Sequence, residues 1–239
     1  MHRCFVDYKI GTSKDIIVNG DEAKHISRVL RLEEGDKLEV CDGSGYIYPA
    51  TIILVDKNSI KLSLQDGVLD KSEPKTKVYL FSGLTKGAKM ELVIQKSVEL
   101  GVSVVIPVET EYAVAKEAKI ERWQRIAFEA VKQCKRPKVP EIYDAMSFDE
   151  AVNLMKTLDV SICAYEKEEI KSTEQVLNGK KPQTIGIFIG PEGGFSKKEI
   201  QKLSESGVEI VSLGKRILRT ETASIVLLTI VMHISGELS

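Results

Sequence analysis

The feature that most constrains the fold is the alternation of strand-like and helix-like segments along residues 77–239. Apolar runs typical of buried strands lie at 78–81, 102–108, 160–165, 184–189 and 208–213. Between them, apolar residues recur at helical spacing at 90–98, 117–134 and 223–234, and capping-box sequences begin two further helices after Ser147 and Ser196. Strands that alternate with helices usually pair in parallel and are covered on both faces. The sequence therefore predicts an α/β domain with a mostly parallel sheet.

Residues 1–72 have a different residue pattern, which predicts a small β-barrel. Short runs rich in β-branched and aromatic residues lie at 16–18, 37–41, 46–55 and 59–64, with turn residues between them. Residues 22–30 carry apolar side chains at helical spacing. The polar stretch 70–74 ends in a proline and is typical of a linker. We therefore expect two domains, 1–72 and 73–239.

Composition places the chain among ordinary globular proteins. Hydrophobic residues make up 43% and charged residues 29%, which excludes disorder as the main state. The net charge of -1 does not indicate a nucleic-acid partner, although cations outnumber carboxylates along 75–138. The four cysteines and three histidines lack metal-ligand spacing, and the first residues lack a signal-peptide pattern. The longest apolar run, 223–234, is too short to span a bilayer, so we expect a reduced, metal-free, cytoplasmic protein.

Two loops in the second half of the chain have the composition of a ligand site. The first, 213–223, carries three cations, a carboxylate and two threonines, with Ile217 and Leu218 expected to be buried among them. The second, 190–196, is rich in glycine and begins a helix. We expect both loops at the carboxyl ends of neighbouring strands, which is where open α/β sheets bind their ligands.

The chemistry of that ligand can be narrowed by exclusion. The G-x-G-x-x-G fingerprint of a dinucleotide site is missing after the first strand, and no phosphate-binding G-x-x-x-x-G-K-[ST] sequence occurs. Four loop glycines, Gly190, Gly193, Gly194 and Gly214, instead allow backbone amides to approach a ligand closely. Such a pocket suits an adenine-bearing molecule with little phosphate. For each glycine taken alone, a tight-turn role is the alternative.

These two loops resemble a known family. Residues 190–194 and 213–223 are similar to the knot motifs of the RsmE-type 16S ribosomal RNA uridine-N3 methyltransferases, which belong to the SPOUT, or trefoil-knot, superfamily. The resemblance extends over nearly the whole chain, through 25–36, 89–101 and 133–140. The chain departs from the family pattern at Lys24, where many relatives carry histidine, and at Lys132, where glutamate is common. Both departures affect expected RNA contacts more than the cofactor loops.

The resemblance implies a fold, a reaction and partners. The expected fold is an N-terminal PUA-like β-barrel that helps to bind RNA and a C-terminal trefoil-knotted SPOUT domain, assembled as a homodimer. The expected reaction is methylation of N3 of one specific uridine in 16S ribosomal RNA of the small subunit, with S-adenosylmethionine as the methyl donor. The residues implied in cofactor binding are Gly190, Pro191, Glu192, Gly193, Gly194, Leu213, Gly214, Ile217, Leu218, Arg219, Thr220, Thr222 and Ala223.

Two charged residues are candidates for catalysis. Uridine N3 carries a proton, so the reaction needs either deprotonation or stabilisation of the anion as it forms. A fixed Arg219 guanidinium could stabilise that anion, and the alternative is an ion pair with Glu221 or Glu192 that only stiffens the loop. Glu221 is a candidate general base, and the alternative is a capping role at a helix N-terminus.

Six residues form the predicted RNA contact, and for each lysine alone a solvated surface position is the alternative. They are Arg28, Arg31, Lys89, Lys96, Gln133 and Arg136. Tyr165 and Phe195 either wall a pocket for the flipped target base or pack in the core. Two other functions stay open: a knotted methyltransferase that acts on another ribosomal or transfer RNA nucleotide, and a non-catalytic RNA-binding ribosome-assembly protein. Cofactor binding would distinguish the last from an enzyme.

Overall fold

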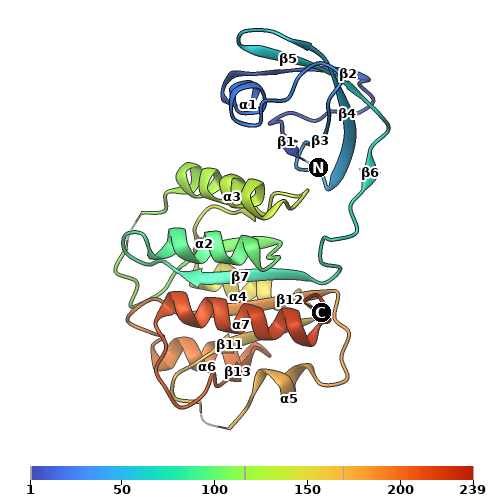
Figure 1. Cartoon of the computed structure of the whole chain (residues 1–239). Helices are drawn as coiled ribbons and strands as arrows, with labels where there is room; N and C mark the ends of the chain where they lie inside the picture. Colours follow the sequence, from blue (N-terminus) through green and yellow to red (C-terminus); the bar gives the residue numbers. More distant parts are fainter. Residues whose placement is uncertain (1, 116, 169, 239) are drawn as a thin grey trace. The chain divides into compact units, whose positions relative to one another are not determined.

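The computed structural model describes residues 2–115, 117–168 and 170–238, and the chain forms two compact units (Figure 1). The first unit consists of Met1–Glu73 together with Val131–Val139, and the second of Pro74–Ala130 together with Pro140–Ser239. A segment far along the sequence, 131–139, therefore packs with the N-terminal unit. No helix within the described residues is long and apolar enough to cross a membrane.

The first unit is built on one sheet of mixed direction. Its strands pair in the order β1-β3-β4-β5-β2, with β6 beside β4, and β1 and β2 are the two ends of this order. The β1–β3 pair is parallel and the other pairs are antiparallel. Strand β5 alternates partly exposed with buried residues, as expected when one face covers a core. The strands are β1 Arg3–Phe5, β2 Asp15–Asn19, β3 Lys37–Cys41, β4 Tyr46–Val55, β5 Ser59–Leu64 and β6 Val68–Leu69.

The helix predicted over 22–30 is not regular, and that prediction is corrected here. A short helix α1, Gly20–Lys24, passes into a π-helical turn η1, His25–Val29. In this turn the amide of Leu30 donates to the carbonyl of His25, five residues back, over 2.9 Å. Ile26 is buried while Arg28 is exposed, and Arg31 follows with a left-handed φ of 55°. Such wide turns and positive φ angles are uncommon outside functional or strained segments.

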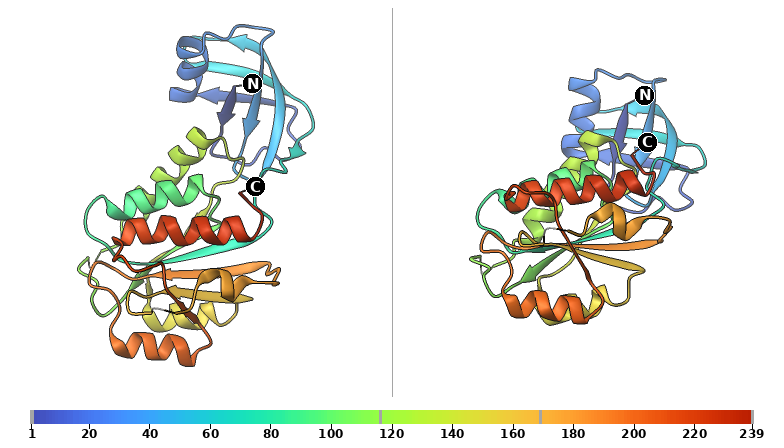
Figure 2. Two further views of the ribbon diagram at one scale, coloured as in Figure 1. Left: turned by 60° about the horizontal axis from the view of Figure 1, so that its bottom comes forward. Right: turned by 90° about the horizontal axis from the view of Figure 1, so that it is seen from below.

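The second unit is a parallel sheet between helices, as the alternation of segments predicts. Its strands pair in the order β10-β8-β7-β12-β11-β13, with β9 beside β8, and every pair is parallel among the described residues. Figure 2 shows α2 and α7 on one face of this sheet and α4 and α6 on the other. The strands are β7 Lys77–Gly83, β8 Val104–Glu109, β9 Glu141–Ile142, β10 Met146–Ser147, β11 Val160–Ala164, β12 Thr184–Ile189 and β13 Glu209–Val211. The helices are α2 Lys89–Glu99, α3 Ile120–Cys134, α4 Phe148–Met155, α5 Thr173–Leu177, α6 Lys197–Glu205 and α7 Thr220–Ile234.

Helices α4 and α6 begin where the capping residues in the sequence predict. The side chains of Ser147 and Ser196 cap α4 and α6, each in a reciprocal capping box with the glutamate three residues later. Both predicted caps are thus confirmed. Several predicted bounds are wrong: α3 begins at Ile120 rather than 117, α7 begins at Thr220 rather than 223, β8 begins at Val104 rather than 102, and β13 is only three residues long.

The two predicted loops follow β12 and β13, but these strands are not neighbours. Strand β11 lies between them and is hydrogen-bonded to both. The prediction of adjacent strands was wrong because sequence order does not reveal where a crossover places a strand in the sheet. A third loop, the one after β11, is consequently placed between the two predicted ones.

Candidate functional site

A cavity of about 490 Å³ lies at the carboxyl ends of β11, β12 and β13. Three loops form its walls, together with the first turn of α7 and one lysine of α2. This is the position at which an open α/β sheet binds a ligand. The cavity is lined by Lys89, Ala164, Tyr165, Glu166, Ile189, Gly190, Pro191, Glu192, Gly193, Gly194, Phe195, Leu213, Gly214, Arg216, Ile217, Leu218, Arg219, Thr220, Glu221 and Ala223.

The loop after β12 is held by close backbone packing. A Cβ on Gly83, at the end of β7, would lie 2.5 Å from the nitrogen of Pro191, so only glycine lets β7 approach this loop. A Cβ on Gly193 would lie 2.7 Å from the Cβ of Tyr112. Phe195 is buried and meets Phe188 edge to face at 4.9 Å, so its ring belongs chiefly to the core.

The loop after β13 is more open than the sequence suggests. Gly214 adopts a φ of 102°, which other residues rarely adopt. Ile217 is 85% exposed and Leu218 is only partly buried, so the expected burial of Ile217 was wrong. Both side chains line the cavity. An exposed isoleucine in a cavity wall provides an apolar surface that a planar ring can cover.

The loop after β11 supplies a wall of which sequence reasoning named Tyr165 but missed Glu166. It contributes Tyr165 and Glu166 to the cavity. A Cβ added to Gly194 would lie 3.5 Å from a carboxylate oxygen of Glu166, so this carboxylate faces the glycine loop. The sequence does show a polar residue, Glu166, shortly after a buried strand. That residue reaches the cavity only because β11 lies between β12 and β13, the strands that precede the two predicted loops.

Two charged groups in the cavity wall lack partners of their own. Arg219 is the N-cap residue of α7, and its exposed guanidinium makes no hydrogen bond or ion pair within the described parts of the chain. One carboxylate oxygen of Glu221, Oε2, is buried and likewise has no hydrogen-bond partner among these residues. The predicted alternative, an ion pair from Arg219 to Glu221 or Glu192, is therefore not formed. A buried polar oxygen without a partner is costly and points to a ligand or water at this position.

The carboxylate of Glu192 is hydrogen-bonded to Lys86 and Lys89 rather than to Arg219. Its Oε1 accepts a hydrogen bond from the Lys89 ammonium at 3.0 Å and one from the backbone amide of Lys86 at 3.3 Å. Partial burial acts to raise the pKa of the Glu192 carboxyl, but the hydrogen bonds from Lys89 and from backbone amides outweigh it, so the pKa lies below its ordinary value. Lys89, predicted to contact RNA, thus lines the cavity and pairs with a predicted cofactor residue.

The predicted cofactor residues are brought together almost completely. All of them line the cavity except Thr222, which is exposed in the first turn of α7. The cavity combines glycine-rich backbone, an apolar edge, an unpaired guanidinium and an unpaired carboxylate oxygen. This combination can hold a neutral ring through backbone groups and stabilise charge that develops beside it. No cluster of potential metal ligands is present among the described residues.

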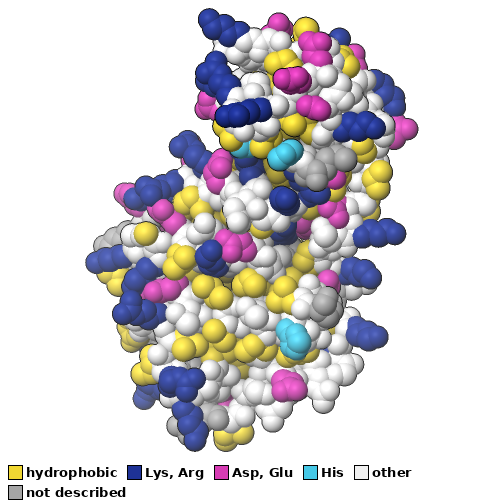
Figure 3. Space-filling model, viewed as in Figure 1, with side chains coloured by type: hydrophobic (Ala, Val, Ile, Leu, Met, Phe, Trp, Pro, Cys, Tyr) yellow, Lys and Arg dark blue, Asp and Glu magenta, His cyan; other side chains and the backbone are white. Residues whose placement is uncertain are grey.

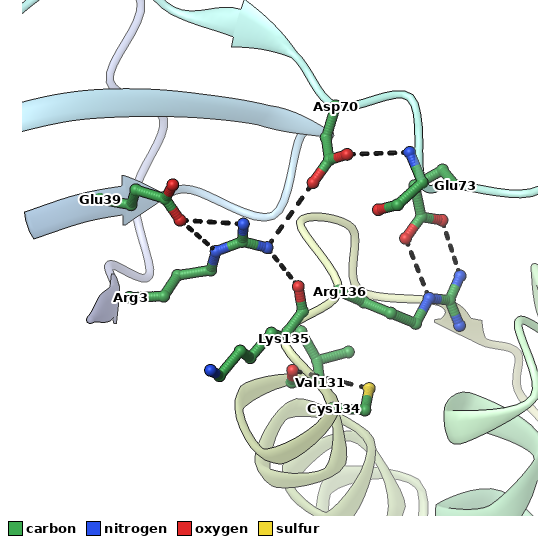
Figure 4. Close-up of polar contacts among 9 residues, drawn as sticks. Arg3, Glu39, Asp70, Glu73, Val131, Cys134, Lys135 and Arg136 are labelled. Atoms are coloured by element: carbon green, nitrogen blue, oxygen red, sulfur yellow. Dashed lines mark hydrogen bonds and ion pairs between the residues drawn. The ribbon is translucent and has the colours of Figure 1, made fainter. Parts of the chain in front are cut away.

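The predicted RNA contacts are dispersed. Arg28, Arg31 and Gln133 are exposed in the first unit, and Lys96 forms an ion pair with Glu99 at 2.8 Å on α2. Arg136 is largely buried, and its guanidinium forms two parallel bonds, of 3.0 and 2.8 Å, to the carboxylate of Glu73 (Figure 4). No pattern in the sequence indicates this pairing.

Comparisons with known proteins cover nearly the whole chain and agree with one another. Residues 71–232 match the RNA methyltransferase domain family, and residues 18–65 match the RNA methyltransferase PUA domain family. The ribosomal RNA small subunit methyltransferase E of Bacillus subtilis is 33% identical over 98% of this chain and 96% of its own. A probable rRNA-methyltransferase from Porphyromonas gingivalis is 30% identical, with a TM-score of 0.88 and 100% of both chains covered. The ribosomal RNA small subunit methyltransferase E of Neisseria gonorrhoeae, solved bound to S-adenosyl methionine, is 27% identical, with a TM-score of 0.86 and 98% of both chains covered.

Proposed function

We infer that this chain, which belongs to the ribosomal RNA small subunit methyltransferase E family, transfers a methyl group from S-adenosylmethionine to 16S ribosomal RNA. The acceptor we propose is N3 of a single uridine, the one numbered 1498 in that RNA. The observation that carries this proposal is the cavity at the ends of β11, β12 and β13, with its glycine loops and its unpaired Arg219 and Glu221. A relative with the same architecture holds S-adenosyl methionine.

The lining of the cavity suits this cofactor chemically. Gly193 and Gly194 line the cavity without side chains of their own, while Leu218 and the exposed Ile217 offer an apolar edge for the adenine ring. Glu166, which faces Gly194, is placed to accept hydrogen bonds from hydroxyl or ammonium groups. When bound, S-adenosylmethionine supplies a methyl group on a positively charged sulfur. The protein has to hold that group in line with a nucleophile, which can account for a large part of the rate.

We assign Arg219 and Glu221 different roles in the reaction of the uridine. N3 must lose its proton before or while it attacks, and the negative charge then spreads over the imide. The Arg219 guanidinium, unpaired inside the described chain, is free to hydrogen-bond that anion. The unpaired Oε2 of Glu221 is available to accept the proton from N3.

The chain also has a surface that suits the proposed homodimer. Helix α7 is apolar along most of its length, and Ile225, Val226 and Ile230 are only partly buried. Leu92 on α2 is 39% exposed, and α2 packs against α7. Figure 3 shows hydrophobic side chains gathered over these two helices. A second copy of the chain, as the family resemblance implies, would cover this face, and ultracentrifugation at micromolar concentration would test it.

Two further features belong to the same proposal. The loops after β12 and β13 are proposed to form the trefoil knot that the resemblance implies, and the protein is proposed to act in the cytoplasm, where small ribosomal subunits occur.

Labelled methyl transfer tests the function directly. Small subunits from cells that lack this protein are incubated with it and with labelled S-adenosylmethionine, and the RNA is digested to nucleosides for mass analysis. Label in N3-methyluridine of 16S ribosomal RNA is the expected result, with large subunits and transfer RNA as controls. Label only in transfer RNA, or no label although the cofactor binds, would contradict the proposed acceptor.

A further inference from the structure

A second cavity, separate from the one described above, lies in the same unit at the carboxyl end of β7. Its volume is about 330 Å³, at the lower end of the range of about 300–1,000 Å³ found for ligand sites. The loop after β7 contributes Thr85, Lys86 and Gly87, and the region before α3 contributes Glu117 and Lys119, with Trp123 of α3 behind them. Nothing in the proposed reaction at the first cavity uses these residues.

Thr85 is the first indication that this cavity holds a polar ligand. The residue is 4% exposed, it lines the cavity, and its hydroxyl has no hydrogen-bond partner among the described residues. A buried hydroxyl without a partner is destabilising, because the group has lost water and gained nothing in return. A ligand atom that accepts a hydrogen bond inside the cavity would remove that penalty.

The charge of the cavity wall indicates that the ligand is an anion. Lys86 and Lys119 are both exposed, and neither ammonium group forms an ion pair within the part of the chain that the structure describes. Glu117 contributes one negative charge, so the wall is positive by one charge overall. Gly87 turns the loop with a φ of 64°, and no atom lies within 4 Å of the position of its missing Cβ, so the loop backbone is open on that side.

The second cavity adjoins the first through Glu192. The backbone amide of Lys86, in the wall of the second cavity, donates to Glu192, which lines the first. Strands β7 and β12, which precede the two loops, are hydrogen-bonded neighbours from Lys77 to Ser82 and from Thr184 to Ile189. The two cavities therefore lie at the carboxyl ends of neighbouring strands, where one extended ligand can contact both.

We propose that this second cavity binds a backbone phosphate of the RNA, next to the nucleotide that is methylated. The inference rests on the proposed function, since it needs RNA as the substrate. The Thr85 hydroxyl donates to a phosphate oxygen, and the Lys86 and Lys119 ammonium groups neutralise the charge at the rim. The contact holds the RNA in register and carries no sequence information itself.

The test compares RNA binding by four variants and the unaltered full-length protein. The probe is a fluorescent RNA hairpin that contains the target uridine, titrated at several salt concentrations, with S-adenosylmethionine affinity measured in parallel. The first variant is the double substitution Lys86→Met with Lys119→Met, and the second is Thr85→Val, which keeps shape and removes the hydroxyl. The matched controls are Lys180→Met, at an exposed lysine before the amino end of β12, and Thr173→Val, at another buried threonine whose hydroxyl has no partner.

The lysine pair should weaken RNA binding about tenfold or more and flatten the plot of log affinity against log salt by roughly 0.7–0.9, which is the contribution of one phosphate contact. Thr85→Val should weaken RNA binding severalfold without a change in the salt slope. Affinity for S-adenosylmethionine should be unchanged in both, and the controls should match the unaltered protein.

The cavity proposal is overturned if the lysine pair keeps the affinity and the salt slope of the unaltered protein, or if Lys180→Met and Thr173→Val have equal effects. Those results could occur while methylation of 16S ribosomal RNA stands. Conversely, an unaltered protein that binds the hairpin in this way but never methylates it would remove the proposed function and leave the phosphate contact standing. Failure of the unaltered protein to bind RNA would remove both.

Discussion

Two arginines next to helix ends have opposite situations in the structure. Arg136 follows α3 and is paired within the first unit, where its guanidinium forms two bonds to the largely buried Glu73. Arg219 begins α7 in the second unit and has no partner among the residues that the structure describes. One charge is satisfied by the chain itself, and the other is left for a ligand. We interpret this difference as that between a structural cation and a cation proposed to act on the substrate.

The neighbourhood of Arg136 shows how such a cation is used for structure. Figure 4 shows a second arginine, Arg3, bonded to Glu39, Asp70 and the carbonyl of Lys135. Lys135 itself has a left-handed φ of 61°, an uncommon conformation for a side chain of this kind. Arg3 thus joins segment 131–139 to strand β1, and Arg136 joins it to Glu73 after β6, in keeping with the place of this segment in the N-terminal unit.

The largest expected effect comes from Arg219→Ala. If Arg219 stabilises the uridine anion, methyl transfer at saturating substrates should fall by about 10²–10³, as for the loss of one oxyanion donor. The free energy of unfolding should change by less than about 0.5 kcal/mol, because the exposed guanidinium forms no hydrogen bond or ion pair with the described residues. Single-turnover transfer and thermal unfolding measure the two quantities. Arg219→Lys, which keeps the charge but not the planar fork, should recover only part of the rate, and an unchanged rate for the alanine variant would exclude the assigned role.

Arg136→Ala should have the reverse profile. It leaves the carboxylate of Glu73 poorly solvated and unpaired, and we expect a loss of about 2–3 kcal/mol, below the roughly 3–5 kcal/mol of a fully buried pair. Methyl transfer per folded molecule should stay close to normal. Urea unfolding measures the loss, and Glu73→Gln combined with Arg136→Met should restore part of it. A stable Arg136→Ala protein with reduced RNA affinity would instead support the RNA contact predicted from sequence.

Gly193→Val tests the cavity wall with a smaller effect. A Cβ at this position would lie 2.7 Å from the Cβ of Tyr112 and 3.0 Å from its carbonyl oxygen, so the loop has to shift. The atoms met are the Cβ and the backbone of Tyr112, so relief has to come from a shift of the glycine loop that lines the cavity, and binding should be affected more than folding. We expect S-adenosylmethionine affinity to fall by about tenfold, roughly 1.4 kcal/mol. Titration calorimetry provides the affinity, and normal affinity with an intact melting temperature would count against the cofactor site.

The smallest effect concerns pH and the Glu192–Lys89 pair. Because the pKa of folded Glu192 lies below its ordinary value, the pair stabilises the protein above the unfolded pKa of about 4.3, and that stabilisation is lost as pH falls through the folded pKa. The unaltered protein should therefore exceed Glu192→Gln in stability at pH 7 by no more than about 1 kcal/mol, since the pair is partly exposed. Denaturation curves from pH 7 to pH 3 should show this difference disappear. A difference that grows on acidification would contradict the assigned pairing.

Local signals in the sequence were sufficient for much of the fold. The glycine loops, the capping boxes at Ser147 and Ser196 and the alternation of strands with helices depend on residues close together in the chain. These features are decided by nearest-neighbour geometry, and a sequence pattern can express them.

The features that were not predicted from the sequence depend on contacts between residues that are distant along the chain. Glu166 lines the cavity only because a crossover places β11 between β12 and β13. Arg136 is paired only because Glu73 is brought beside it from 63 residues earlier. The Thr85 hydroxyl is notable only because burial leaves it without a partner. Periodicity and spacing contain no information on which distant group lies next to a given side chain.

Hydrogen–deuterium exchange with and without S-adenosylmethionine tests the central claim most directly, because it observes both regions in one experiment. The account predicts slower exchange, on binding, in the loops after β11, β12 and β13 at 164–166, 190–195 and 213–219. It predicts no change around Arg3, Glu73 and 131–139, where the charges are already paired. Protection confined to that second region, or no protection in the three loops at saturating cofactor, would contradict the assignment of the cavity and of its unpaired charges to the ligand.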